Sequence, residues 1–421
     1  MLTFLSPLMR KMLRLGSGEA LARLCSVITL IFLAHRFGVV LVGVYALSQT
    51  MLLYSQPFID FGMKHVGARL VARYPQAAKT IMHRVQRRRI TMALVLLPLL
   101  LVYAVSTRLP WSLRACLLAI AAISPLYALS LDWLAWAKER LGLAGLGRSV
   151  IPIVVLVCVL LGRHSANVLW WVVLGQLIGI LLHSAILWVW WKSQKHAEDE
   201  VLPLPQIHES LAWQRTSILG LATLCNLAFN SIDMLMLGVM SNPREVGLYS
   251  ASYRVVNQVF FTYYLLTQVL YPQLARQDAQ QRVRMLSPRV LLALAAVGTA
   301  LATVLTLTRR PVLGVLFGPQ FLPATLLLLL LAWAIPLDFL TSYLNNAYLA
   351  WGMEKKLLLC TIIAAGSNVI LNLIWIPIYG AAAAAANTLV SYVLYLVSLG
   401  FVARYAKELA SSRQQPVVAP A

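Results

Sequence analysis

Long apolar segments, which recur along the whole chain, constrain the possible folds most strongly. Of the 421 residues, 60% are hydrophobic and only 12% are charged, whereas soluble domains carry about 25% charged residues. A helix that crosses a bilayer needs about 20 mostly apolar residues. The sequence therefore predicts an all-α polytopic membrane protein with about twelve spans. These spans are residues 17–36, 39–59, 90–107, 112–132, 149–162, 167–191, 215–238, 246–271, 289–308, 322–350, 356–377 and 380–402.

Basic residues are concentrated in every second loop between these segments. Counted from the N-terminal tail, 27 of the 35 Lys and Arg residues fall in one set of loops and 7 in the other. Because cytoplasmic loops are enriched in Lys and Arg, both termini are predicted to be cytoplasmic. The basic segment 64–89 is predicted to be a cytoplasmic loop that contacts anionic lipid headgroups. The net charge of +21 thus reflects membrane topology, and no nucleic-acid partner is expected.

The two halves of the chain share a short sequence pattern. Residues 42–48 read VGVYALS, and residues 246–252, which lie 204 positions later (42 to 246), read VGLYSAS. Each copy opens a predicted helix, so we expect two six-helix bundles of the same orientation around a central cavity. Transporters with such a duplication bind cargo between the halves and alternate access, which favours a carrier over an enzyme. The predicted parts are an N-terminal bundle (1–191), a cytoplasmic linker (192–214), a C-terminal bundle (215–403) and a cytoplasmic tail (404–421).

Motifs of catalysis or metal binding are absent from the sequence. It contains no GxSxG, HExxH or P-loop motif, and its histidines are scattered. The five cysteines are isolated in apolar segments or at the start of one, which is typical of packing residues. We therefore expect no enzyme activity, no catalytic residues, no metal and no cofactor.

Charged side chains inside spans are costly and often mark functional positions. Arg254 in the eighth span and Arg23 near the inner end of the first are candidates for binding phosphate. A guanidinium suits phosphate because it donates two parallel hydrogen bonds. The candidates for ion coupling or gating are acidic residues in the spans, namely Asp233, Asp338 and Glu19.

Amide side chains in the spans are candidates for binding sugar; these are Asn230, Asn257 and Asn387. Structural roles stay open as alternatives. Arg254 can snorkel to headgroups or pair with Asp233, and Glu19 and Arg23 are spaced for a local helical ion pair. Amides in spans also form hydrogen bonds between helices.

Several short motifs, taken in order, resemble those of one transporter superfamily. Besides the repeated pattern they are FIDFGM at 58–63, DMLMLG at 233–238, VGLYSASYR at 246–254 and LFGPQF at 316–321. The chain resembles the Wzx-like polysaccharide-transport flippases of the multidrug/oligosaccharidyl-lipid/polysaccharide exporter superfamily. The resemblance implies a flippase in the bacterial inner membrane. Its cargo would be a polyprenyl-diphosphate-linked oligosaccharide, an O-antigen or exopolysaccharide repeat unit, and a polysaccharide polymerase would be a suitable partner.

Other functions stay open as alternatives. A cation-coupled multidrug exporter of the same superfamily would favour an acidic lumen, so Arg254 argues against it. A peptidoglycan-precursor flippase would usually have two further helices. A membrane glycan polymerase or ligase tends to carry a large outer loop, whereas the outer loops here are short.

Overall fold

The computed structural model describes residues 2–194, 213–275 and 287–412. Two compact units make up the chain, unit 1 (Met1–Leu227) and unit 2 (Ala228–Ala421). Every regular element in the described residues is a helix, which confirms the all-α prediction. The units divide inside helix α9 (Trp213–Met240), so the first part of this helix belongs to unit 1. Most of the predicted linker 192–214 lies outside the described residues, and the predicted domain boundaries stay a prediction.

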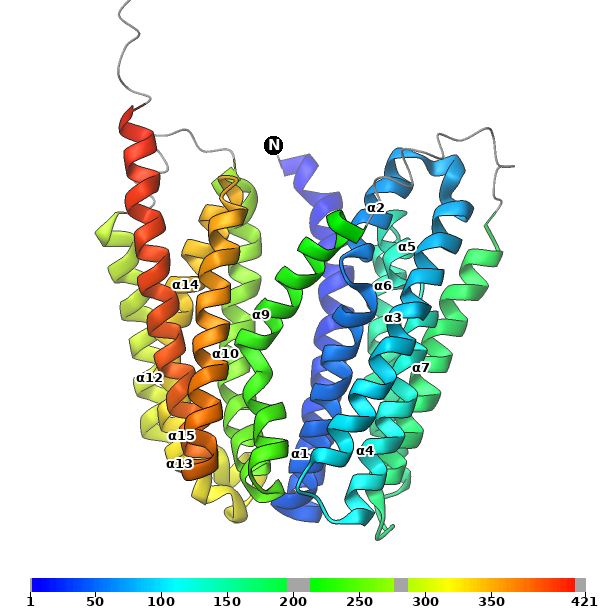
Figure 1. Cartoon of the computed structure of the whole chain (residues 1–421), viewed down its shortest axis with the longest axis vertical. Helices are drawn as coiled ribbons and strands as arrows, with labels where there is room; N and C mark the ends of the chain where they lie inside the picture. The colour runs from blue at the N-terminus through cyan, green and yellow to red at the C-terminus, as the bar shows by residue number, and fades with distance from the viewer. Residues whose placement is uncertain (1, 195–212, 276–286, 413–421) are drawn as a thin grey trace, which may run out of the picture. The chain divides into compact units, whose positions relative to one another are not determined.

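Unit 1 is a bundle whose first helix is broken by a glycine. Gly38, with φ 83°, separates α1 into the two predicted spans, because this conformation is open mainly to glycine. Figure 1 shows this break at the same end of the unit as the α3–α4 and α6–α7 connections, as alternating spans require. Helix α1 packs against α6, which packs against α7. The elements before α9 are α1 (Leu2–Asp60), α2 (Met63–Arg73), η1 (Pro75–Ala77), α3 (Ala78–Ser106), α4 (Trp111–Ile123), η2 (Ser124–Leu129), α5 (Asp132–Ala137), α6 (Leu141–Leu161) and α7 (Val168–Lys192).

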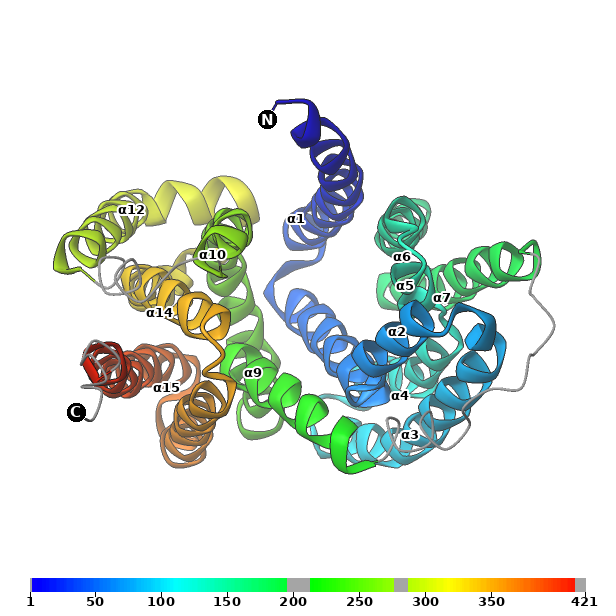
Figure 2. The ribbon, with the colours of Figure 1, turned by 90° about the horizontal axis from the view of Figure 1, so that it is seen from above.

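Unit 2 repeats this plan after α9, and its last helix is also broken by a glycine. Gly380, with φ 57°, divides α15 into the two predicted spans. Helix α14 packs against α10, α12 and α15, as the view from above shows (Figure 2). The core of unit 2 contains Phe229, whose ring lies 4.9 Å from Tyr392 and 5.1 Å from Tyr395. The elements after α9 are α10 (Pro243–Ala275), α12 (Pro288–Phe317), η3 (Pro319–Ala324), α13 (Thr325–Ala332), α14 (Ala334–Ala350) and α15 (Glu354–Ser412).

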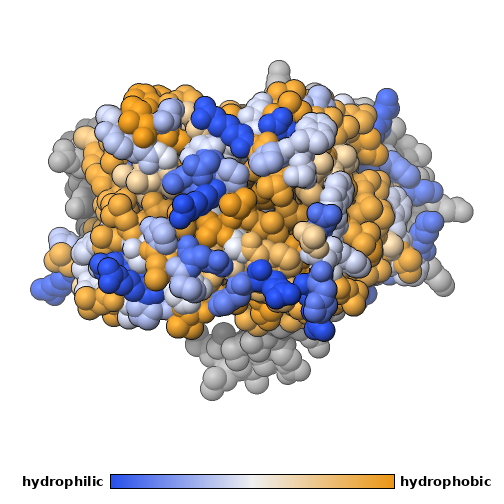
Figure 3. Space-filling view, turned by 90° about the horizontal axis from the view of Figure 1, so that it is seen from below, coloured by the Kyte–Doolittle hydropathy of each residue, from blue (hydrophilic) through white to orange (hydrophobic). Residues whose placement is uncertain are grey.

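The flanks of the helices are suited to lipid. Among the described residues, eight helical stretches are long and apolar enough to cross a membrane, and two of these contain the breaks at Gly38 and Gly380. Large apolar side chains on α12 point outward; Leu307, for example, is 75% exposed. Figure 3 shows the molecule from below, along the helices, and on this end surface hydrophilic residues lie among hydrophobic ones. Ten of the predicted spans lie within one helix each, to within one residue at the ends, whereas 112–132 and 322–350 each run over several short helical elements. The chain is a multi-pass membrane protein.

The prediction of a basic loop over residues 64–89 is wrong. This segment folds into α2, η1 and the first turns of α3, and its last basic residue, Arg89, is buried.

The sharp turn before α2 depends on Gly62, which has φ 79°. A Cβ atom at this position would overlap the carbonyl oxygen of Thr216 on α9, so only glycine fits.

Candidate functional site

A buried carboxylate lies at the centre of a polar network in unit 2. Asp233 on α9 is 1% exposed. Its Oδ2 accepts hydrogen bonds from the hydroxyls of Tyr249 at 2.8 Å and Thr388 at 3.0 Å, and its Oδ1 accepts one from Asn372 Nδ2 at 2.5 Å. A buried ionised group is costly unless hydrogen bonds compensate for lost water. Helix α10 and both halves of α15 supply these three donors.

Amides extend the network along α15. Asn372 Nδ2 also donates to Asn368 Oδ1 at 2.9 Å, and Asn387 Nδ2 donates to Asn372 Oδ1 at 3.0 Å. The chain is broken at Gly380, so the amides of Asn372 and Asn387 come from different helical segments. The structure thus brings two of the predicted site residues, Asp233 and Asn387, into one network. In this conformation the side-chain amides of Asn372 and Asn387 form a hydrogen bond between two helical segments.

The second acidic candidate, Asp338, lies apart from Asp233 in sequence and has its own partners. It is 9% exposed on α14. Its Oδ1 accepts a hydrogen bond from Tyr392 Oη at 3.2 Å and another from Ser342 Oγ at 3.3 Å. The Tyr392 ring packs 4.9 Å from Phe229, so the aromatic core of unit 2 fixes one of these donors.

The predicted cationic residues occupy less buried positions. Arg254 and Asn257 are half-buried on α10, and Tyr253, which precedes them on this helix, donates a hydrogen bond to the backbone carbonyl of Asn230 at 2.5 Å. The hydrogen-bond donors to the Asp233 carboxylate are the neutral side chains of Tyr249, Thr388 and Asn372, and not the Arg254 guanidinium that the sequence suggested as a partner.

In unit 1, the candidates near the start of α1 are described only in part. Arg23 is half-buried on this helix. The predicted pair between Glu19 and Arg23 stays a prediction.

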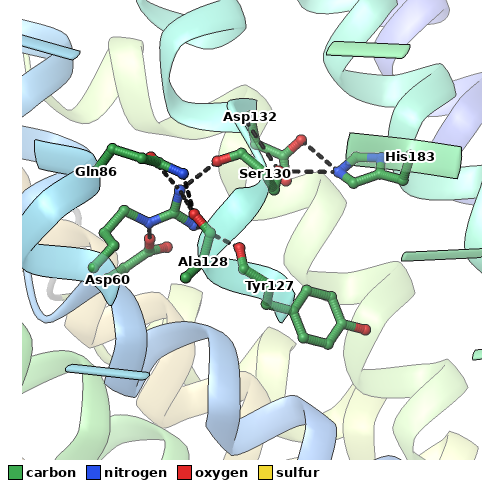
Figure 4. Close-up of polar contacts among 8 residues, drawn as sticks. Asp60, Gln86, Tyr127, Ala128, Ser130, Asp132 and His183 are labelled. Atoms are coloured by element: carbon green, nitrogen blue, oxygen red, sulfur yellow. Dashed lines mark hydrogen bonds and ion pairs between the residues drawn. The ribbon is translucent and has the colours of Figure 1, made fainter. Parts of the chain in front are cut away.

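Unit 1 also contains a buried charged residue, Arg89, in the segment that was predicted to be a cytoplasmic loop. The side chain of Arg89 is 6% exposed, and its Nε lies 2.8 Å from Asp60 Oδ1 at the end of α1. The guanidinium also donates to the backbone carbonyls of Tyr127, Ala128 and Ser130, and Figure 4 shows these carbonyls gathered beside Asp60. We call this cluster the Arg89 clamp. It ties α1 and α3 to the short helix η2, whose end carbonyls have few partners within η2.

Next to the clamp, α7 contributes a buried histidine. His183 Nε2 lies 2.9 Å from Asp132 Oδ1 and 3.1 Å from Ser130 Oγ, as Figure 4 shows. Asp60, Asp132 and His183 were not among the predicted site residues, because Asp60 and Asp132 lie at or beyond the ends of predicted spans and a lone histidine is no motif. The FIDFGM motif contains Asp60, and this motif was the signal that could have drawn attention to it.

Three solved structures show the fold that this chain shares with known transporters. The inward closed conformation of the lipid II flippase MurJ aligns with a TM-score of 0.73 and 13% identity over 94% of this chain and 90% of that one. An inward-facing multidrug resistance MATE family transporter of the MOP superfamily aligns with a TM-score of 0.64 and 12% identity over 97% and 99%. A point mutant of the Vibrio cholerae MATE transporter VcmN gives a TM-score of 0.60 and 14% identity over 98% and 99%.

Sequence comparisons give a family for the chain. A search by sequence among curated proteins finds no match. The match to a family of known proteins covers residues 8–278, which is more than half of the 421 residues. The chain therefore belongs to the family of polysaccharide biosynthesis proteins.

Proposed function

We propose that the protein is a flippase that moves a polyprenyl-diphosphate-linked oligosaccharide across the bacterial inner membrane. The observation that carries this proposal is the family match over residues 8–278 of a chain that consists of membrane-spanning helices. A structural likeness to a lipid II flippase supports it, because that protein also flips a lipid. The O-antigen or exopolysaccharide repeat unit is the cargo that we infer. The termini lie in the cytoplasm, and a polysaccharide polymerase is a suitable partner.

The internal duplication suggests how such cargo would move. Two related bundles can alternate access to a polar headgroup while the polyprenyl tail stays in lipid. Outward movement of an anionic diphosphate gains about 2.3 kcal/mol per charge per 100 mV when the inside is negative. Arg254 and Arg23 would bind the diphosphate in this mechanism, and Asn230, Asn257 and Asn387 would contact sugar.

Acidic residues of the predicted spans are the groups that we propose for ion coupling or gating. The donors around Asp233 are hydroxyl and amide groups, which can reorient when the carboxylate takes up a proton or a cation. Asp338, held by Tyr392 and Ser342, is the second candidate, and Glu19 is the third. Coupling through these groups would add to the electrical driving force on the cargo.

Arg254 gives a direct test of diphosphate binding. We expect Arg254→Glu to lower export of lipid-linked saccharide at least about tenfold, since a carboxylate repels the diphosphate. Arg254→Lys, which keeps the charge but loses the two parallel hydrogen bonds, should export more than Arg254→Glu and less than the wild type. The measurement is surface polysaccharide in a deletion strain that expresses each variant at equal membrane levels. Arg244→Glu, at an exposed position on the same helix, is the matched control. Normal export by Arg254→Glu would contradict a role for this guanidinium.

Cation-coupled drug export is the second candidate function, and one observation favours it. The MATE transporters share the fold, and the buried carboxylate of Asp233 has the charge that a cationic drug would pair with. Deletion of the gene separates the two functions. Loss of surface polysaccharide without a change in drug sensitivity supports the flippase, whereas drug sensitivity with normal polysaccharide supports the exporter. A membrane glycan polymerase or ligase would instead show polymerising activity in purified form.

A further inference from the structure

Unit 1 contains a polar cavity of about 470 Å³. This volume falls within the range of roughly 300–1,000 Å³ that is typical of small-molecule sites. Both halves of α1 line the cavity, together with α6, α7 and the η2–α5 segment. Leu53, one of the lining residues, is 50% exposed, so the cavity communicates with the surface.

Two amides that line the cavity have unused hydrogen-bonding atoms. Gln176 on α7 is 3% exposed, and its Oε1 has no hydrogen-bond partner among the described residues. Gln49 on α1 also lines the cavity, and its buried Nε2 has no hydrogen-bond partner among the described residues. A buried amide atom without a partner costs about 1–3 kcal/mol, so such atoms usually indicate a missing ligand or water. One of the two atoms is an acceptor and the other a donor.

The charges around the cavity do not suit an anion. No described lining residue is Lys or Arg. The acidic and basic members of the lining, Asp132 and His183, pair with each other at 2.9 Å. The diphosphate of the cargo would therefore find no compensating cation among the described residues that line the cavity. A neutral ligand meets no such penalty.

The sequence repeat shows how the residues that line the cavity in unit 1 differ from the corresponding residues of unit 2. At the repeat offset, Tyr45 corresponds to Tyr249, and Thr29 corresponds to Asp233. In unit 2, Tyr249 donates its hydroxyl hydrogen to the Asp233 carboxylate, and neutral donors fill the surroundings. In unit 1, Tyr45 and Thr29 both line the cavity. Unit 1 thus has the small hydroxyl of Thr29 at the position where unit 2 has the Asp233 carboxylate, and the cavity lies next to this hydroxyl.

These groups together fit a sugar ring. The hydroxyls of a sugar both donate and accept hydrogen bonds, so they can satisfy the acceptor Gln176 Oε1 and the donor Gln49 Nε2. The aromatic faces of Tyr45 and Tyr127 can cover the apolar side of the ring. In Figure 4 the Tyr127 ring extends away from the contacts around Asp60 and Gln86.

We propose that the cavity in unit 1 binds a neutral sugar residue of the lipid-linked saccharide, with its hydroxyls bonded to Gln49 and Gln176. This inference rests on the proposed function, which supplies the saccharide. It divides the recognition of the cargo. One neutral sugar residue is bound by amides in unit 1, further sugar residues contact Asn230, Asn257 and Asn387, and the diphosphate is bound by cationic residues such as Arg254.

Binding of free sugars to the purified full-length protein tests the proposal. The probes are lactose, maltose and N,N′-diacetylchitobiose, titrated by saturation-transfer NMR with the protein in nanodiscs. We expect saturable binding of at least one disaccharide. Gln176→Leu, which removes the buried acceptor, should weaken that binding roughly three- to tenfold, because a hydrogen bond contributes about 0.5–1.5 kcal/mol. Gln49→Leu should act in the same direction and serves as the second variant where Gln176→Leu is poorly folded.

Ser184→Ala is the matched control. Ser184 is also buried on α7, and its Oγ has no hydrogen-bond partner among the described residues, but it does not line the cavity. Its loss should therefore leave sugar binding unchanged. The proposal is overturned if the wild type binds none of the three disaccharides, or if both glutamine variants bind them as the wild type does. Failure of the proposed function would look different, because the wild type would then move no lipid-linked saccharide in reconstituted vesicles.

Discussion

Arg89→Ala should lower the free energy of unfolding by about 3 kcal/mol, one of the two largest effects on stability that we expect. Loss of one member of a buried ion pair typically costs about 3–5 kcal/mol, because the partner is left without a counter-charge. The side chain of Asp60 is 20% exposed, so water recovers part of this cost and the lower end of the range applies. The carbonyls of Tyr127, Ala128 and Ser130 also lose their donor. The measurement is reversible unfolding in mixed micelles.

Two further variants show whether the clamp itself causes the loss. Arg87→Ala, at an exposed position on the same helix, should change stability little. Asp60→Asn should be less destabilising in combination with Arg89→Met than on the wild-type background, because the charge left unpaired is then gone. Equal losses for Arg87→Ala and Arg89→Ala would show that the clamp does not stabilise unit 1.

Asp233→Asn should abolish most export while the protein stays folded. The amide has the size of the carboxylate and keeps an acceptor for Tyr249 and Thr388, but it cannot carry a negative charge or take up a proton. If Asp233 couples export to an ion, we expect export to fall at least about tenfold. The measurement is surface polysaccharide, normalised to the amount of protein in the membrane.

Asp233→Leu separates the structural contribution from the functional one. It removes the acceptor of three buried donors, and each unsatisfied group costs about 1–3 kcal/mol. Thr388 has a second acceptor in the Ala384 carbonyl at 2.8 Å, so two donors are left unsatisfied and we expect a total loss of about 2–6 kcal/mol. Thr223→Val, exposed on the same helix, is the control for α9. Wild-type export by Asp233→Asn would exclude a coupling role for this carboxylate.

The helices could be predicted from the sequence because their cause is local. Apolar length alone gave the positions of the spans, including the two pairs that a glycine separates at Gly38 and Gly380. The basic segment before α3 was misjudged for a physical reason. Composition cannot tell a solvated arginine from Arg89, whose counter-charge, Asp60, lies on another helix.

The acidic residues of the candidate site could be predicted from the sequence, but their hydrogen-bond donors could not. Asp233 and Asn387 stood out because charge and amides are costly in lipid. That Tyr249, Thr388 and Asn372 would be the donors to Asp233 depends on the packing of four helical segments. The cavity in unit 1 escaped notice because Gln49 and Gln176 are neutral, and a cavity is a property of three-dimensional packing.

The most direct test of the account is movement of a lipid-linked saccharide by the pure protein. The substrate is a short polyprenyl-diphosphate oligosaccharide with a fluorescent sugar, incorporated into proteoliposomes, and the signal is protection of the fluorophore from an external quencher. We predict that wild-type protein exchanges the label between leaflets faster than protein-free liposomes do, and that Arg254→Glu does so more slowly than wild type. Exchange by the wild type at the protein-free rate, with an electrical potential imposed in either direction, would contradict the proposal that this chain is a flippase.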